Sequence, residues 1–290
     1  MKKHFFIGWA VAWCWMNTVA EAQGIYFSKF YDAVTNSPEV GVRLDTIPGG
    51  YAFTTLQGPA NNFPGDMLII TDTLGNVVHQ KQWYKGLTCT GLRYRQQDST
   101  FLFWGYFWTG ESDPYAFLMR TTFWGDTIWS NTYNPPSMDF CRNALELPDG
   151  SILMCGTSKA NAFDNVVLIK TDSVGNQRWV RYYNYDFKIH DTFGLLLQPD
   201  GSILVGYNAK EYYKPNQDTT ILYWDGYGLI NIDTAGNILR DTFYLLGGAR
   251  GKPWQGWMVQ LPNDRVAFTA FEEITDWHDF GFVAVNTQTF

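Results

Sequence analysis

The sequence predicts an all-β protein built as a β-propeller of four-stranded antiparallel blades. Three observations lead to this fold class: the composition, two sequence markers that recur in phase, and the alternation of apolar and polar residues between them. Aromatic residues make up 18% of the chain and charged residues only 17%, and there are 27 glycines. Aromatic and β-branched residues favour strands, while glycine favours turns. The composition is therefore typical of an all-β chain.

The first marker is a turn that contains Asp-x-x-Gly, as in the stretch DSVGNQRW that begins at Asp172. Its glycine recurs at intervals of 50, 50 and 61 residues, at Gly75, Gly125, Gly175 and Gly236. The second marker, seen as LPDGSILM and QPDGSILV, occurs five times in phase with the first. Repeats with periods of about 20–50 residues are the sequence signature of solenoids, propellers or arrays.

One repeat can be divided into four strands. Residues 142–147 form strand A, 151–156 strand B, 166–171 strand C and 177–183 strand D, with turn residues between them. Four antiparallel strands in a unit of about 50 residues indicate a propeller blade. A solenoid is the alternative, but strand-rich solenoid repeats are usually about 20–30 residues long.

The repeats predict five blades that close into a ring. We expect blades at residues 39–85, 88–134, 139–185, 189–246 and 253–290. The fifth lacks a strand D, and residues 24–32 match the pattern of the other D strands. Pairing of this N-terminal strand with the fifth blade would leave no open sheet edge at the closure. The alternative is that the chain is part of a longer propeller protein.

The N-terminus has the features of a secretory signal peptide. Lys2 and Lys3 precede an apolar run over residues 5–16, and an Ala-Glu-Ala site ends at Ala22. We therefore expect a signal peptide at 1–22 and a propeller domain at 23–290. The run is shorter than the roughly 20 residues that span a bilayer. We expect an exported protein, secreted or at the cell surface, with no membrane span.

Charge and cysteine content narrow the classes of partner. The net charge is −7 and no Lys/Arg cluster is present, which argues against nucleic acid as a partner. Beyond the signal peptide the cysteines are Cys89, Cys141 and Cys155. A single Cys141–Cys155 bridge and buried free thiols both remain open. We expect a monomer.

The unit DGSILMCGTS…NVVLIKTDSVGNQRWVRYYN resembles the quinoprotein-like and Asp-box-like propeller repeats of secreted Bacteroidetes surface proteins, which are type IX secretion substrates. The resemblance covers nearly all of residues 24–290. It implies a propeller in an exported protein and names no activity. The resemblance does not include the C-terminal sorting domain that accompanies such repeats.

The sequence offers few candidates for catalysis. Quinoprotein dehydrogenases need eight blades, so we expect no cofactor, and the histidines lack metal-ligand spacing. Three acidic residues stand just before strand A of units 1, 3 and 4, at Glu39, Asp139 and Asp191. Paired carboxyl groups at about 5–10 Å hydrolyse glycosidic bonds. A five-bladed glycoside-active enzyme is therefore one hypothesis, although such residues also cap turns.

The preferred hypothesis is a binding or scaffold module. The A–B and C–D turns are short and alike, whereas the B–C loops vary, and variable loops on a rigid scaffold usually carry binding sites. Aromatic residues in these loops would contact a glycan or peptide ligand, and the candidates are Trp108, Tyr207, Tyr212, Tyr213 and Trp277. The longest insertion, Tyr207 to Asp225 in unit 4, is the loop we expect to matter most.

Overall fold

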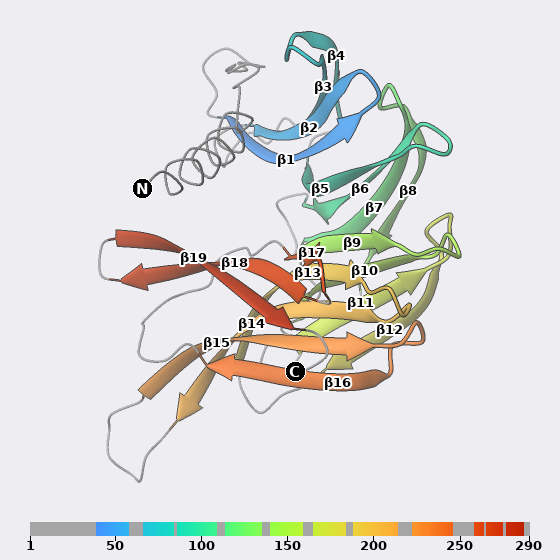
Figure 1. The fold of residues 1–290 in the computed structure, drawn as a ribbon. Coiled ribbons are helices and arrows are strands. Elements are labelled where there is room, and N and C mark those ends of the chain that lie inside the picture. Colours follow the sequence, from blue (N-terminus) through green and yellow to red (C-terminus); the bar gives the residue numbers. More distant parts are fainter. Residues whose placement is uncertain are drawn as a thin grey trace, which may run out of the picture.

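The computed structural model describes residues 39–57, 66–83, 86–108, 114–134, 140–158, 165–183, 188–213, 222–245, 258–263, 265–274 and 277–286. These residues form a five-bladed β-propeller of antiparallel sheets, which confirms the predicted fold class (Figure 1). The described part of the fifth blade has three strands, and each of the other blades has four.

The strands follow one another in sequence order within each blade. Blade 1 contains β1 (Glu39–Ile47), β2 (Gly50–Gln57), β3 (Met67–Asp72) and β4 (Val77–Gln82). Blade 2 contains β5 (Leu87–Arg95), β6 (Thr100–Phe107), β7 (Tyr115–Thr122) and β8 (Thr127–Tyr133). Blade 3 contains β9 (Asn143–Glu146), β10 (Ile152–Ser158), β11 (Asn165–Thr171) and β12 (Gln177–Tyr183).

Blade 4 contains β13 (Lys188–Leu197), β14 (Ile203–Tyr213), β15 (Leu222–Ile232) and β16 (Ile238–Leu245). Blade 5 contains β17 (Met258–Leu261), β18 (Arg265–Ile274) and β19 (Trp277–Asn286). The strands of blade 3 agree with the predicted A–D segments to within two residues at each end. The residues 24–32 expected to close the ring, and the expected signal peptide at 1–22, lie outside the described residues.

The hydrophobic core lies between neighbouring blades. One cluster joins blades 1 and 2, including Leu68 and Phe103, and another joins blades 2 and 3, including Leu118 and Met154. Two further clusters join blades 3 and 4 and blades 4 and 5. Strand alternation explains this arrangement, because the two faces of each sheet bury their apolar residues against different neighbours.

The recurring Asp-x-x-Gly stretch is a turn between strands C and D. The Asp172 carboxylate accepts hydrogen bonds from the backbone N–H groups of Val174 and Asn176, at 3.1 and 2.8 Å. Gly175 has a φ of 83°, a left-handed conformation that glycine adopts without strain. Asp72 and Asp233 form the same turn in blades 1 and 4.

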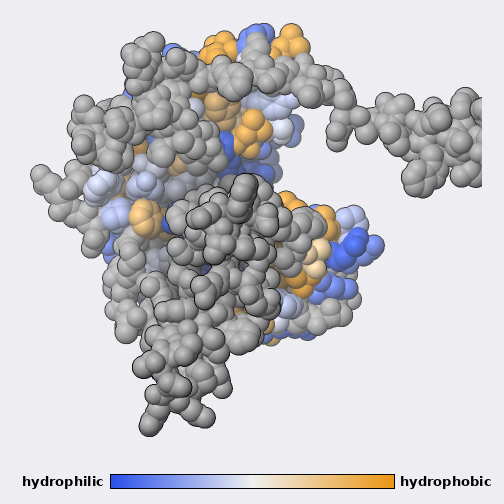
Figure 2. Space-filling model, turned by 90° about the vertical axis from the view of Figure 1, so that its left-hand side faces the viewer, coloured by the Kyte–Doolittle hydropathy of each residue, from blue (hydrophilic) through white to orange (hydrophobic). Residues whose placement is uncertain are grey.

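The tight A–B and C–D turns lie on one face of the ring, and the strand ends that lead into the B–C and D–A connections lie on the other. Figure 1 shows the turns of blades 2, 3 and 4 on the right. Figure 2 looks onto this second face, where hydrophilic and hydrophobic side chains both reach the described surface. No helix in the described part of the chain is long and apolar enough to cross a membrane.

The structure corrects the prediction of a long loop in blade 4. Instead, β14 continues to Tyr213 and pairs in register with β15, with Tyr212 opposite Tyr223 and Tyr213 opposite Leu222. The described parts of the insertion are thus strands and not loop. Aromatic residues such as Tyr212 and Tyr213 have a high strand propensity.

Candidate functional site

Asp191 and Arg142 form an ion pair where the inner strands of blades 3 and 4 begin. The Arg142 Nε lies 3.0 Å from Asp191 Oδ1 and 2.9 Å from Oδ2. The backbone N–H of Thr192 donates to the same carboxylate at 2.9 Å. Two bulges in β13, on either side of Asp191–Thr192, shift the register here. Bulges re-aim side chains near functional sites, and this one places the carboxylate beside blade 3.

Two aromatic rings extend the ion pair into a larger cluster. The Arg142 guanidinium lies over the Phe140 ring, 5.0 Å from its centroid. Phe140 meets Tyr106 edge to face at 4.8 Å. All four side chains are partly exposed, and they come from β6, the segment before β9, and β13. We name Tyr106, Phe140, Arg142 and Asp191 the mouth cluster.

The mouth cluster leaves donors available to a ligand. Asp191 is bonded through the Arg142 Nε, and within the described part of the chain no residue accepts a hydrogen bond from the two Arg142 Nη groups. Burial raises the pKa of the Asp191 carboxyl above its usual range, and the charge of Arg142 opposes that rise. The side chain of Asp191 is only 18% exposed. The cluster therefore combines a carboxylate, a guanidinium and two rings at one partly open place.

A second buried carboxyl group lies on the same face. Asp66 precedes β3 and accepts a hydrogen bond from the backbone N–H of Cys89 in β5, at 2.5 Å. Burial raises the Asp66 pKa to about 7, and the Cys89 N–H opposes the rise. Asp66 is only 1% exposed. It therefore joins blade 1 to blade 2 and is closed to a substrate.

The carboxylates predicted from sequence have different outcomes. Asp191 lies within β13, not before it, and belongs to the mouth cluster. Glu39 begins β1, where it pairs with Gln57 in the ladder. Asp139 lies outside the described residues. The sequence prediction missed Arg142 and Phe140 and did not select Tyr106 among its candidate binding residues. Their position beside a D–A connection or at the end of a B strand is the signal that could have found them.

The predicted binding residues also differ from one another. Trp108 follows β6, is partly exposed, and its backbone N–H donates to Gly86 O at 2.8 Å. Tyr207 is 0% exposed, so its placement among exposed loop aromatics is wrong. Its ring packs over Gly228, where a Cβ would lie 1.8 Å from Tyr207 Cζ. Tyr212 and Tyr213 lie in β14, and Trp277 begins β19. The structure describes the backbone of these three residues but not their side chains.

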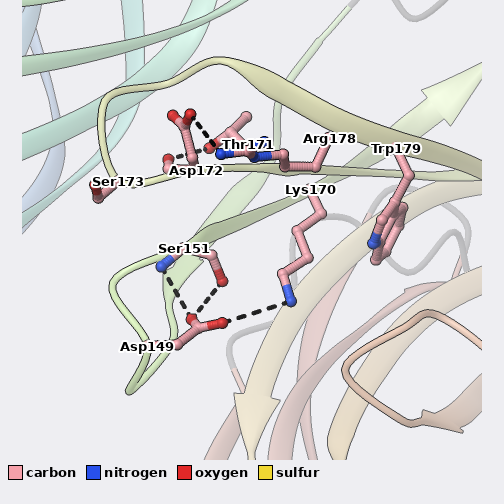
Figure 3. A pocket seen from close by; sticks show the side chains of 8 residues that line it. All are labelled: Asp149, Ser151, Lys170, Thr171, Asp172, Ser173, Arg178 and Trp179. Atoms are coloured by element: carbon pink, nitrogen blue, oxygen red, sulfur yellow. Dashed lines mark hydrogen bonds and ion pairs between the residues drawn. The ribbon is translucent and has the colours of Figure 1, made fainter.

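A pocket of about 380 Å³ lies on the opposite face of blade 3 (Figure 3). Its polar groups are engaged in the turns themselves. Asp149 accepts hydrogen bonds from Ser151, and Lys170 donates to Thr234 O at 3.1 Å. Arg178 pairs with Asp172 at 3.2 Å. Because these groups stabilise the turns, the mouth cluster is the better candidate site.

Metal and thiol chemistry find little support in the described residues. No group of three or more His, Cys, Asp or Glu side chains there could hold a metal ion. Cys89, Cys141 and Cys155 are free thiols, and all three are buried. Of the two alternatives left open by the sequence, the structure therefore has buried thiols and not a Cys141–Cys155 bridge.

Comparisons with known proteins identify the fold. No protein family matches the sequence, and no curated protein is significantly similar to it. The solved structure of α-L-arabinofuranosidase Arb93A from Fusarium graminearum with an iminosugar inhibitor is similar, with a TM-score of 0.52 and 12% identity. The match covers 83% of this chain and 79% of that one. The same fungal enzyme in complex with arabinobiose has a TM-score of 0.50 at 13% identity, covering 83% and 80%.

Hydrazine synthase from Kuenenia stuttgartiensis has a TM-score of 0.49 at 12% identity. That match covers 76% of this chain but only 61% of the synthase chain. At these identities the likeness shows the fold alone. The two arabinofuranosidase structures, with TM-scores of 0.52 and 0.50, are nevertheless of a glycoside hydrolase and not of a binding module. They overturn the sequence-based preference for a binding or scaffold module over a glycoside-active enzyme.

Proposed function

We propose that the protein is a carbohydrate-active enzyme that hydrolyses glycosidic bonds at the mouth cluster. The observation that carries the proposal is the Asp191 carboxylate, held by Arg142 and the Thr192 N–H at 2.9–3.0 Å beside two aromatic rings. The shared fold with an arabinofuranosidase supports it. The substrate is a glycan, and no particular sugar is assigned.

The chemistry requires two carboxyl groups in different environments. Asp191 is the candidate for the ionised one: burial raises its pKa, but the Arg142 guanidinium 2.9 Å away opposes that rise and favours the charged form. Asp191 attacks the anomeric carbon or activates the water that does. Glu39 and Asp139 are the candidates for the proton donor that the sequence offers; Glu39 begins β1, and Asp139 lies outside the described residues. Tyr106 and Phe140 offer apolar surface to a sugar ring.

We further propose that the enzyme acts outside the cell. The basic and apolar N-terminal segment and the resemblance of the repeats to those of secreted Bacteroidetes surface proteins support export. The acidic net charge of −7 is compatible with a neutral or basic glycan.

The test is sugar release from a panel of aryl glycosides and polysaccharides by the purified protein. We expect the wild type to release sugar from at least one substrate. Asp191→Asn should lower kcat/KM at least about 100-fold, the usual minimum for a group that transfers a proton or attacks. Asp126→Asn is the matched control, because Asp126 is an exposed carboxylate on the opposite face.

Two outcomes would contradict the proposal. No release from any substrate would remove the assigned activity. Full activity in a folded Asp191→Asn variant would remove Asp191 from the reaction. A melting curve of each variant separates loss of activity from loss of folding, since the substitution leaves Arg142 without its ion-pair partner.

A further inference from the structure

Blades 1 to 4 are joined by a repeated contact that we call the seam. In each seam, an aromatic residue near the end of strand D donates a hydrogen bond to the carbonyl of the glycine in the next blade's C–D turn. The pairs are Trp83 Nε1 to Gly125 O at 3.1 Å, Tyr133 Oη to Gly175 O at 2.6 Å and Tyr183 Oη to Gly236 O at 2.8 Å. Because this bond joins the blades in all three seams, residues in which the seams differ are available for another role.

Two of the seams carry a long cationic side chain over the turn glycine. Lys81 lies over Gly125, with its Cγ 3.0 Å from where a Cβ would stand, and its Nζ pairs with Asp126 at 3.0 Å. Arg181 lies over Gly236 in the same way, with its Cγ 3.1 Å from where a Cβ would stand. In both seams the long side chain therefore covers the turn.

The seam between blades 2 and 3 has the short Asn131 at the corresponding position. The Asn131 amide nitrogen lies 2.5 Å from where a Gly175 Cβ would stand. Beside it runs a groove of about 610 Å³ between strand D of blade 2 and the C–D turn and strand D of blade 3. Small-molecule sites usually have volumes of about 300–1,000 Å³. We name this groove, lined by residues 131–134, 175–177, 180 and 182, the rim groove.

The rim groove is lined by amide and hydroxyl groups. The residues that bring amide side chains to it are Asn131, Asn134, Asn176 and Gln177. None of the described side chains that line it carries a charge. Amide and hydroxyl groups donate and accept hydrogen bonds, as the hydroxyl groups of a sugar do. The lining therefore suits a neutral polar ligand better than an ionic one.

Two of these amides are held in one orientation by the turn of blade 3. The Asn131 nitrogen donates to Val174 O at 3.1 Å, and the Asn176 nitrogen donates to Asp172 Oδ2 at 3.0 Å. Both partners are acceptors, so the nitrogen and oxygen of each amide are distinguished. Among the described residues, none donates to the two amide oxygens. The rim groove thus offers two oriented acceptors, which lowers the entropy cost of binding.

Tyr182 adds an aromatic surface to these polar groups. It lies two residues after Val180 in β12, so both side chains point toward blade 2. The Tyr182 side chain is 37% exposed. A tyrosine ring is apolar and carries a polar hydroxyl. It can therefore pack on the C–H groups of a sugar ring and bond its hydroxyl groups.

We propose that the rim groove binds a neutral saccharide, as a second carbohydrate site apart from the mouth cluster. The two sites lie at opposite sheet edges, because Arg142 precedes β9 and the rim groove is built on β8 and β12. The net charge of −7 disfavours an acidic glycan. A polysaccharide held at the rim stays close to the mouth cluster, which raises its effective concentration there. The ligand class follows from the groove itself and does not require hydrolysis.

The test is affinity electrophoresis of the purified protein in gels that each contain one soluble polysaccharide. Arabinan, galactomannan, xylan and mixed-linkage β-glucan are the neutral probes, and polygalacturonate is the acidic one. Two variants alter the rim groove. Tyr182→Ala removes the aromatic surface, and Asn131→Arg fills the groove with the residue that the seam of blades 3 and 4 has at this position.

The fold already accommodates such an arginine. The Arg181 guanidinium lies over the Trp179 ring, 5.9 Å from its centroid, and Trp129 stands at the matching position in strand D of blade 2. Ser130→Arg is the matched control. It adds the same charge at the next residue of β8, which is exposed and does not line the groove. Melting curves of all variants verify folding.

We expect at least one neutral polysaccharide to retard the wild type. Asn131→Arg and Tyr182→Ala should each weaken that binding at least about tenfold, a usual effect of losing a central contact. Ser130→Arg should bind like the wild type. Asn131→Arg should also cleave a small aryl glycoside at the wild-type rate, because such a substrate needs only the mouth cluster.

The proposal is overturned if no neutral polysaccharide retards the wild type, or if polygalacturonate alone does, since the ligand would then be anionic. It is also overturned if either groove variant is folded and binds like the wild type. Loss of that binding in Phe140→Ala would then assign it to the mouth cluster. Since the measurement is of binding, absence of sugar release contradicts the proposed hydrolysis and leaves this result standing.

Discussion

The hydroxyl of Tyr133 donates a hydrogen bond of 2.6 Å to the carbonyl oxygen of Gly175, a residue of the next blade. Burial raises the pKa of Tyr133 above its usual range, which favours the protonated hydroxyl that donates this bond. The bond satisfies the carbonyl of a glycine that also shapes the C–D turn. One side chain thus links the outer strand of one blade to the turn of the next.

Tyr133→Phe should destabilise the protein by about 1–3 kcal/mol, because it leaves a buried carbonyl without its donor. Urea unfolding would measure the loss in the free energy of unfolding. Tyr182→Phe is the control, since Tyr182 is a tyrosine of strand D with 37% of its surface exposed. An equal effect of the two substitutions would contradict the assigned role of the hydroxyl.

Gly175→Ala should be more destabilising than Gly201→Ala. Both glycines have a positive φ, 83° and 84°, so both variants carry the backbone strain, about 1 kcal/mol or more. A Cβ at Gly201 meets nothing within 4 Å, whereas one at Gly175 would approach Asn131 and Trp129. The difference between the two melting temperatures therefore reports the contacts of residue 175 with strand D of blade 2. Equal melting temperatures would show that Asn131 and Trp129 can move aside at no cost.

Glu146 neutralises two arginines between blades 2 and 3. Its Oε1 lies 2.7 Å from Arg95 Nη1 and 3.1 Å from Arg120 Nη2, and the Arg120 side chain is 5% exposed. Glu146→Gln should cost about 3 kcal/mol, because a buried guanidinium loses its counter-charge. Asp126→Asn, which breaks the exposed pair with Lys81, should cost less than about 1 kcal/mol. Chemical denaturation of both variants compares them directly, and similar losses would contradict the prediction.

The turns and strands could be predicted because their signals are local. Asp172 and Gly175 lie three residues apart and form one turn, and the apolar alternation on either side gives the strands. The extended hairpin of β14 and β15 was missed because turn-type residues around Pro215 outweighed the strand propensity of Tyr212 and Tyr213. Burial of Tyr207 was missed because its partner, Gly228, lies 21 residues away.

The site was harder to predict than the fold. Asp191 was a candidate from its position, but its pairing with Arg142 joins residues 49 apart through a bulge in β13. No local pattern encodes that register shift. Asp66 looks like an ordinary loop residue after Pro64 and Gly65, and its burial depends on the start of blade 2.

Asp66 should make the stability of the protein fall as the pH rises from about 4 to about 7. Its pKa is raised by burial to about 7 in the folded protein, whereas an unfolded aspartate titrates near 3.8. Between these values the folded state holds a proton that the unfolded state releases, so the free energy of unfolding decreases with pH. The full shift corresponds to on the order of 4 kcal/mol, fully present below about pH 4 and lost above about pH 7.

Asp66→Asn isolates this contribution, because the amide oxygen can still accept the Cys89 N–H but cannot ionise. Thermal melts at several pH values between 4 and 8 should show wild type losing stability relative to Asp66→Asn as the pH rises. Other titrating groups, including Asp191, act equally on both proteins and cancel in the difference. Asp126→Asn provides the comparison for an exposed carboxylate and should show no such divergence. Parallel pH profiles for wild type and Asp66→Asn would mean that Asp66 is ionised in the folded protein, and that solvent or a cation reaches the junction of blades 1 and 2.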